Sequence, residues 1–245
     1  MFARSQRTAR PVRTARSSRL AAAACAFVLL SGAASGCGVV NKIKSIRRTI
    51  DKNKATIQTF TDGLKNAKSV PFQATYVTTG TTPTTVVYAV RPPKDISFSE
   101  SAAGGSNSTR LIANASGEYA CSQVSAGSRW TCKKLAKANA IAQKSLFAVY
   151  TPSHWVAFLR LFAFGAGLAG DKVTTSTMTV NGFAMSCVDL FAKGSGRSTI
   201  CTTKQNILGY VRVATQSTAF EIKSYTSSPP ASAFRLPAGA TVTRR

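Results

Sequence analysis

The chain is 245 residues long, and its formal net charge of +24 reflects 32 Lys and Arg residues against only 8 Asp and Glu residues. Hydrophobic residues make up 44% of the chain and charged residues 16%, a balance that excludes long disorder. The mean hydropathy of +0.01 excludes a protein with several membrane-spanning helices. Eight carboxylates and one histidine leave few groups for acid–base catalysis, so we expect a binding protein and not an enzyme.

The first 36 residues have the layout of a secretory signal. Six arginines and no acidic residue lie in residues 1–19, and an apolar run follows over residues 20–30. This run is shorter than the about 20 apolar residues that a membrane span needs, and small residues follow it, as at a cleavage site. Mitochondrial transit peptides are also rich in Arg and poor in acids, but their amphipathic character does not fit the solidly apolar run.

The cleavage region reads Ala34-Ser35-Gly36-Cys37 and resembles the lipobox of bacterial lipoproteins, although that family more often has Leu at the position of Ala34. The resemblance implies diacylglycerol transfer to the Cys37 sulfur, fatty acids such as palmitate at that residue, and cleavage before it. The mature protein is then held at the outer face of the bacterial cell membrane. An ordinary cleaved signal with a free Cys near the new terminus is the alternative.

Cleavage before Cys37 changes the size and the charge of the chain. Removing 36 of the 245 residues leaves 209, and losing six arginines lowers the net charge from +24 to +18. We expect residues 1–36 to be the signal peptide and residues 37–245 to form a single domain, because a chain of this size can bury a substantial core.

Four cysteines follow the proposed anchor, and an even number of cysteines in an exported chain favours disulfides. Cys121 and Cys132 flank a Ser/Gly turn, whereas Cys187 and Cys201 flank Gly194-Ser195-Gly196. This spacing favours two local pairs, Cys121 with Cys132 and Cys187 with Cys201. A metal site is the alternative, but the chain has no CxxC motif and only one distant His, so we expect neither a metal nor a cofactor.

Residues 39–64 carry apolar side chains at the spacing of a helix. The apolar positions fall in two heptad registers, which are Val39, Ile46 and Phe60, and Ile43, Ile50, Ile57 and Leu64. Asn53 is the one polar break in this pattern. We expect a long amphipathic helix that covers a sheet, with a coiled-coil partner helix as the alternative.

Strand-like segments lie on both sides of residues 135–170. They are residues 72–79, 84–91, 96–98, 111–113, 118–123, 129–134, 174–180, 183–190, 198–203, 207–213 and 220–225. Asn181-Gly182 joins two β-rich runs and predicts a type I′ hairpin. In the last segment Phe220 and Ile222 alternate with Glu221 and Lys223, which indicates a strand with one buried face and one solvent-exposed face. The sequence therefore predicts an α+β fold with an antiparallel meander.

The segment between the two sets of strands has a helical composition. Residues 135–149 are rich in Ala, and Thr151 and Pro152 then have the types expected at the N-cap and first position of a second helix. Apart from Arg160, this second helix is almost wholly apolar up to three glycines. Its large apolar residues are candidates to line a ligand pocket, with an ordinary core as the alternative: Trp155, Phe158, Leu159, Phe162 and Phe164.

The order of elements over residues 39–240 resembles the LolA-type fold, an antiparallel β half-barrel whose concave face is plugged by helices. Residues 220–225 and the segment Phe234-Arg235-Leu236-Pro237 are similar to the closing strand and the Phe-x-Leu-Pro segment of that family. Actinobacterial cell-envelope lipoproteins with related half-barrels also carry a lipobox like that at Cys37. The resemblance implies a half-barrel with a long N-terminal helix and central helices on its concave face, which binds acyl chains or lipidated cargo. The two predicted disulfides are not part of the general pattern of the family.

Basic residues gather directly after the proposed anchor. Within 17 residues of Cys37, only Asp51 opposes six cations, which are Lys42, Lys44, Arg47, Arg48, Lys52 and Lys54. We expect these side chains to lie near the anionic membrane surface or acidic wall polymer, where each contributes about 1 kcal/mol. A solvated face without a specific role is the alternative. The export signal argues against nucleic acid as a partner, despite an isoelectric point near 10.6.

Three functions remain open, and they differ in the residues they need. The first is a monomeric, membrane-anchored lipoprotein that binds a hydrophobic or lipid ligand in the half-barrel. The second is an envelope binding or structural module that contacts anionic lipid, acidic wall polymer or a protein partner. The third is a hydrolase built on His154, which has the weakest support because the nearest acid downstream, Asp171, lies beyond three glycines.

Overall fold

The structure is a computed structural model that describes residues 36–80, 82–104, 106–136, 144, 147–169, 171–216 and 219–243, with the backbone alone for residues 36–43, 68, 106 and 163–169. Its helices are α1 (Gly36–Asn66) and α3 (Pro152–Ala169), with short 3-10 turns η1 (Ala67–Ser69), η2 (Ala148–Tyr150) and η3 (Ala231–Phe234). Its strands are β1 (Phe72–Thr78), β2 (Thr84–Arg91), β3 (Asp95–Ala102), β4 (Ser106–Asn114), β5 (Gly117–Ser125), β6 (Thr131–Lys134), β7 (Lys172–Val180), β8 (Phe183–Ala192), β9 (Gly196–Thr203), β10 (Leu208–Arg212), β11 (Ala219–Thr226) and β12 (Thr241–Thr243).

All twelve strands of the described residues belong to one open sheet. Their order is β12-β6-β5-β4-β3-β2-β1-β11-β10-β9-β8-β7. Two antiparallel meanders, β1–β6 and β7–β11, join where β1 pairs with β11, and β12 is the one strand that runs parallel to its neighbour, β6. The sheet does not close into a barrel, since β7 and β12 form its two ends. The predicted α+β fold with an antiparallel half-barrel is therefore confirmed.

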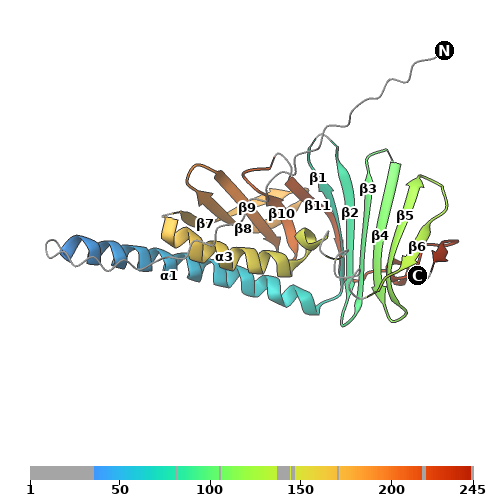
Figure 1. Cartoon of the computed structure of the whole chain (residues 1–245), viewed down its shortest axis with the longest axis horizontal. Coiled ribbons are helices and arrows are strands. Elements are labelled where there is room, and N and C mark those ends of the chain that lie inside the picture. The colour runs from blue at the N-terminus through green and yellow to red at the C-terminus, as the bar shows by residue number, and fades with distance from the viewer. Residues whose placement is uncertain are drawn as a thin grey trace, which may run out of the picture.

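The two helices pack side by side against the sheet (Figure 1). In Figure 1, α3 runs along α1 in the opposite direction, beside β7–β11, and the N-terminal end of α1 extends past the strands. The main core lies between the helices and the sheet, where Ile57 and Leu64 of α1 and Leu159 of α3 are buried with strand residues such as Tyr76 and Ile222. The expected role of the first helix, covering a sheet, is thus confirmed.

A second, smaller core lies on the other face of β4–β6. Leu111 of β4 belongs to the main core, whereas the next residue, Ile112, belongs to the second cluster, because successive side chains of a strand point to opposite faces. The C-terminal segment packs on this face, and it contributes Leu236 and Ala240 to the cluster. After η3 the segment ends as β12 at the edge of the sheet.

Three local expectations need correction. Strands β3 and β4 are much longer than the predicted residues 96–98 and 111–113. Their remaining positions hold mainly Ser, Thr and Asn, which pair with the neighbouring strand through the backbone but give no apolar pattern in the sequence. Pro152 does begin α3, but the hydroxyl of Thr151 donates to the carbonyl oxygen of Ala148 at 2.7 Å and does not cap the helix. Of the expected helix 135–149, residues 135 and 136 are not helical and 148 and 149 lie in η2, while most of the rest lies outside the described residues.

The predicted signal peptide lies almost wholly outside the described residues, which begin at Gly36 in the first turn of α1. The predicted cleavage point before Cys37 falls within this turn. Within the described part of the chain, neither α1 nor α3 combines the length and the apolar character that a membrane-spanning helix needs.

Candidate ligand-binding groove between α1 and α3

The apolar residues expected to line a pocket sit in or beside the main core. Trp155 and Leu159 are buried, and the indole N–H of Trp155 donates to the carbonyl oxygen of Val149 at 2.5 Å. Phe158 and Phe162 are half-buried and pack against the same core, with the ring of Phe158 5.5 Å from that of Trp155. The side chain of Phe164 lies outside the described residues. A ligand role for these five side chains stays a prediction.

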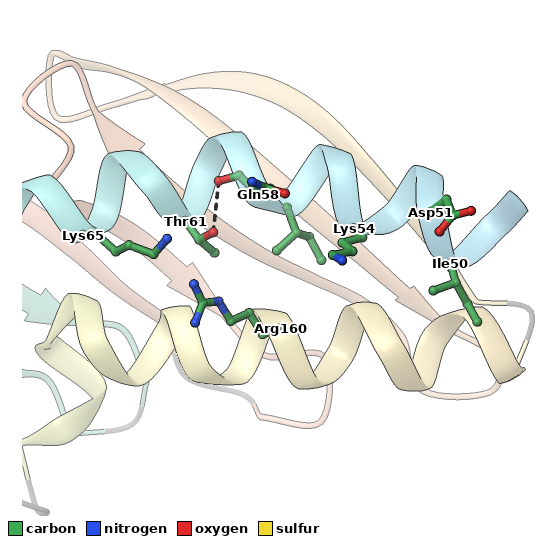
Figure 2. Close-up of a pocket in the computed structure, with 8 residues that line it drawn as sticks. Ile50, Asp51, Lys54, Gln58, Thr61, Lys65 and Arg160 are labelled. Carbon is green, nitrogen blue, oxygen red and sulfur yellow. Dashed lines mark hydrogen bonds between the residues drawn. The ribbon is translucent and has the colours of Figure 1, made fainter. Parts of the chain in front are cut away.

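A groove of about 620 Å³ lies instead between the two helices (Figure 2). Its lining consists of one residue of α3, Arg160, and seven residues of α1, which are Ile50, Asp51, Lys54, Ile57, Gln58, Thr61 and Lys65. The α1 residues recur every three or four positions, so they share one side of the helix. The same periodicity that buries Ile57 and Leu64 therefore also places lysines along the edge of the groove.

The floor of the groove is apolar. Ile57 is only 2% exposed, and Ile50 is half-buried further toward the start of α1. Thr61 is buried, and its hydroxyl donates to the carbonyl oxygen of Gln58 at 3.0 Å. Because this hydroxyl already has a partner within the helix, it adds little polarity to the floor.

Three cations border this floor. Figure 2 shows Lys54 and Lys65 of α1 and Arg160 of α3 on the two sides of the same space. The ammonium of Lys65 pairs with Asp62, whereas Lys54 and Arg160 have no hydrogen bond or ion pair among the described residues. Asp51 is the one carboxylate of the lining. Like charges held near one another raise the local potential, so the groove favours an anionic group at its edge.

Sequence reasoning missed most of this groove. It treated Arg160 as an interruption in an apolar helix, and it did not single out Thr61 or Lys65. The spacing of Lys54, Thr61 and Lys65 beside the apolar positions was a usable signal, because it marks the boundary of the buried face. Which residue of the second helix lies opposite them depends on how the two helices pack. The sequence of either helix alone does not predict this packing.

The basic residues near the proposed anchor lie on the surface of α1. Lys44, Arg47, Arg48, Lys52 and Lys54 are exposed. The side chains of Cys37 and Lys42 lie outside the described residues, but both residues belong to the first two turns of α1. Cys37, the proposed anchor, and the basic residues therefore lie on one continuous helix, and α1 carries seven cations against Asp51 and Asp62.

Among the described residues, His154 has neither a serine nor a carboxylate as a side-chain hydrogen-bond partner. Its half-buried ring lies edge-on against Trp155, with ring centroids 5.1 Å apart, and it makes no hydrogen bond within the described part of the chain. Residues 36–243, where described, also hold no group of three His, Cys, Asp or Glu side chains that could bind a metal ion.

Both predicted disulfides are present. Cys121 pairs with Cys132 and Cys187 with Cys201, with S–S distances of 2.09 and 2.04 Å. Each bridge joins directly opposed residues of adjacent antiparallel strands, β5 with β6 and β8 with β9. Local pairing is confirmed in both cases.

Three tyrosines near the start of α3 have shifted acidities. Burial raises the pKa of Tyr76 and of Tyr88 well above the ordinary value for a phenol. Burial, and to a smaller extent the nearby carboxylate of Glu100, raises the pKa of Tyr150 to about 12. These groups therefore stay neutral and belong to the core and not to any acid–base chemistry near neutral pH.

No protein-family model and no curated protein matches the chain. Among solved structures, it is similar to an uncharacterized conserved protein from Thermus thermophilus, with 10% identity, a TM-score of 0.45, and coverage of 77% of this chain and 98% of that one. It is similar to MucB at 10% identity and a TM-score of 0.46, over 76% of this chain and 64% of that one. For MucB in complex with MucA(peri) the values are 10%, 0.38, 76% and 62%. The chain thus spans less than two thirds of either MucB chain, and these distant likenesses concern the fold alone.

Proposed function

We propose that this chain is a non-enzymatic binding protein of the bacterial cell envelope that holds an anionic amphiphile in the α1–α3 groove. The amphiphile is an acyl chain with a negatively charged head. The protein is anchored at the outer face of the cell membrane through lipid on Cys37. This proposal keeps the lipid ligand expected from the sequence, and it places the ligand between the two helices and not between the helices and the sheet.

The observation that carries the proposal is a pair of cations, Lys54 and Arg160, that have no partner among the described residues and that border a floor containing Ile50 and Ile57. Ile50 is half-buried and offers apolar surface to an acyl chain, whereas Ile57 is almost fully buried. Burial of exposed apolar surface contributes about 25 cal/mol per Å². A carboxylate or phosphate head at the edge of the groove then interacts with the guanidinium of Arg160 or the ammonium of Lys54. A neutral oil lacks the second interaction, and an inorganic anion lacks the first.

The position of the groove also supports a role at the membrane. It lies on the helix whose first turn contains Cys37, and Leu161, next to Arg160 on α3, is 73% exposed. An anchored α1 brings Lys44, Arg47 and Arg48 close to anionic lipid, where each basic residue contributes about 1 kcal/mol. An amphiphile that leaves the bilayer then needs to travel only a short way to the groove.

Binding of a fluorescent dansyl fatty acid to the full-length chain tests the proposal. The double variant Lys54→Gln/Arg160→Gln should bind it about tenfold more weakly, which corresponds to a loss of about 1.4 kcal/mol. The matched control is Lys94→Gln/Lys133→Gln, which removes two exposed cations from the β2–β3 turn and from β6 and should keep the affinity. The uncharged methyl ester of the probe should bind all three proteins alike. No binding by the unmodified chain, or an equal loss in both variants, would overturn the proposal.

A further inference from the structure

A second hollow lies on the opposite side of α1, between this helix and the edge strand β7. Its volume is about 860 Å³. From α1 it is lined by Arg48, Thr49, Lys52, Asn53, Thr56 and Thr59, and from the other wall by Asp171, Lys172, Val173, Thr174 and Thr175. These α1 residues alternate with those of the α1–α3 groove in the sequence, so the 3.6-residue period places the two sets on different sides of the helix. The hollow is thus a separate site.

Asn53 is the unusual residue of this site. It is only 3% exposed, and its buried side-chain Nδ2 has no hydrogen-bond partner among the described residues. An amide donor buried without a partner costs a protein on the order of 1–3 kcal/mol. A leucine would continue the apolar stripe of α1 without this cost. Because Nδ2 is shielded from solvent, it meets an acceptor in the hollow only when the side-chain amide turns about its Cβ–Cγ bond.

Charge at the rim indicates the kind of acceptor. Arg48, Lys52 and Lys172 are exposed, and none of them forms an ion pair within the part of the chain that the structure describes. Asp171 is the one carboxylate of the lining, and its Oδ1 already accepts the backbone N–H of Lys193 at 2.9 Å. Three free cations and an unpartnered amide around one hollow match the oxygens of an anion, and a guanidinium is especially suited to phosphate.

The hollow continues along the sheet as a trough lined by hydroxyl groups. A neighbouring hollow of about 710 Å³ shares Thr56, Thr59 and Thr175 with the first and reaches Lys204. Its further polar lining consists of Ser176, Thr177, Ser186, Thr202, Thr203 and Asn206. Serine and threonine hydroxyls both donate and accept hydrogen bonds, so this strip suits a partner that itself carries hydroxyl groups.

We propose that this trough binds a polyol phosphate, with the phosphate beside Asn53 and the hydroxylated part along the Thr/Ser strip toward Lys204. The phosphate oxygens accept from Arg48, Lys52 and Lys172, and from the Asn53 amide once it has turned toward the hollow. The site differs in chemistry from the α1–α3 groove, whose floor is isoleucine. A phospholipid headgroup and a soluble or polymeric sugar or glycerol phosphate share the recognised chemistry.

Calorimetric titration of the full-length chain with glycerol 3-phosphate tests the site. Lys52→Gln/Lys172→Gln should weaken binding at least tenfold, while the control Lys94→Gln/Lys133→Gln should keep it. Asn53→Leu should weaken binding to a similar degree and raise the thermal midpoint, because it removes an unpartnered amide from the core. An Asn53→Leu protein that is less stable would overturn the proposal, since it would show that the amide has a structural role.

Two further arms separate the sources of the phosphate. Inorganic phosphate should bind more weakly than glycerol 3-phosphate, and equal affinity would contradict the role of the hydroxyl strip. Flotation with phosphatidylglycerol vesicles identifies a lipid headgroup as the source if flotation falls in Asn53→Leu and in Lys52→Gln/Lys172→Gln. Failure to bind glycerol 3-phosphate together with flotation that both variants leave unchanged would overturn the site. The variants of Lys52, Asn53 and Lys172 leave the lining of the α1–α3 groove unchanged, so the two proposals fail independently.

Discussion

The guanidinium of Arg110 in β4 donates a hydrogen bond to the carbonyl oxygen of Ala233, 2.5 Å away, and so holds the C-terminal segment against the sheet. The same Nη2 lies 3.1 Å from the carbonyl oxygen of Ser232. Further along β4, the side-chain amide of Asn114 donates to the carbonyl oxygen of Phe234 at 2.8 Å. These bonds align η3 across β3 and β4, and the chain then covers the second core.

Replacing Arg110 should loosen this segment. Arg110→Ala removes the two backbone contacts, and the free energy of unfolding should fall by about 1–3 kcal/mol, because two hydrogen bonds from a charged donor, one exposed and one part-buried, are lost. Trypsin should then cut after the exposed Arg235 faster than in the unmodified chain. Arg129→Ala, which alters an exposed Arg ahead of β6, is the control and should leave the cleavage rate unchanged. Equal cleavage rates for both variants would show that Arg110 does not hold the segment.

The two disulfides should differ in what their removal does to the fold. Their sequence separations of 11 and 14 residues each give a loop-entropy contribution of about 3 kcal/mol. The Cys187–Cys201 bridge lies in the main core, whereas Cys121–Cys132 lies in the second cluster. Cys187→Ser/Cys201→Ser should therefore destabilise the protein more than Cys121→Ser/Cys132→Ser. Denaturant titration measures both, and the reverse order would contradict the assignment of the two cores.

Local features of the fold were readable from the sequence. Asn181-Gly182 forms the predicted hairpin turn, with φ of 51° and 82°, which Asn and Gly adopt at low cost. The long helix and both cysteine pairs followed from the spacing of like residues. These features depend on contacts within a few residues of each other or across one turn. At that range the spacing of apolar residues or cysteines in the sequence directly reflects the helix or hairpin that they form.

Pairings over long distances in the sequence were not readable in the same way. The antiparallel contact of β1 with β11 and the parallel contact of β12 with β6 join segments that no short-range pattern links. The α1–α3 groove likewise depends on which side of α1 faces α3. Asn53 was visible as a polar break, but its burial depends on β7 lying beside it.

Stability should fall steeply at alkaline pH. Burial raises the pKa of Tyr76 and Tyr88 above the phenol value and that of Tyr150 to about 12, while in the unfolded chain each ionises near pH 10. The folded state therefore holds protons that the unfolded state releases, so this stability is present below about pH 10 and is lost above it. Urea titrations at several pH values measure the free energy of unfolding. Tyr150→Phe should make this free energy fall less steeply with pH between about pH 10 and 12. An unchanged slope in Tyr150→Phe would contradict the assignment.

Lipidation should depend on Cys37 alone. Cells that express the full chain and are fed a labelled fatty acid should transfer label to the protein, and Cys37→Ser should abolish both the label and the retention of the protein in the membrane fraction. Cys25→Ser, which removes the cysteine of the upstream apolar run, is the control and should keep the label. Label that persists in Cys37→Ser would overturn the proposed anchor and localisation.

The position of a bound acyl chain is the most direct test of the proposed function. A photoreactive fatty acid can be crosslinked to the full-length chain, and the modified peptides can be mapped by mass spectrometry. The crosslinks should fall on the lining of the α1–α3 groove, at Ile50, Ile57 or Gln58 of α1 and beside Arg160 of α3, and an excess of unlabelled fatty acid should suppress them. Crosslinks at Trp155 and Leu159, between the helices and the sheet, would instead place the ligand in the half-barrel and contradict the groove.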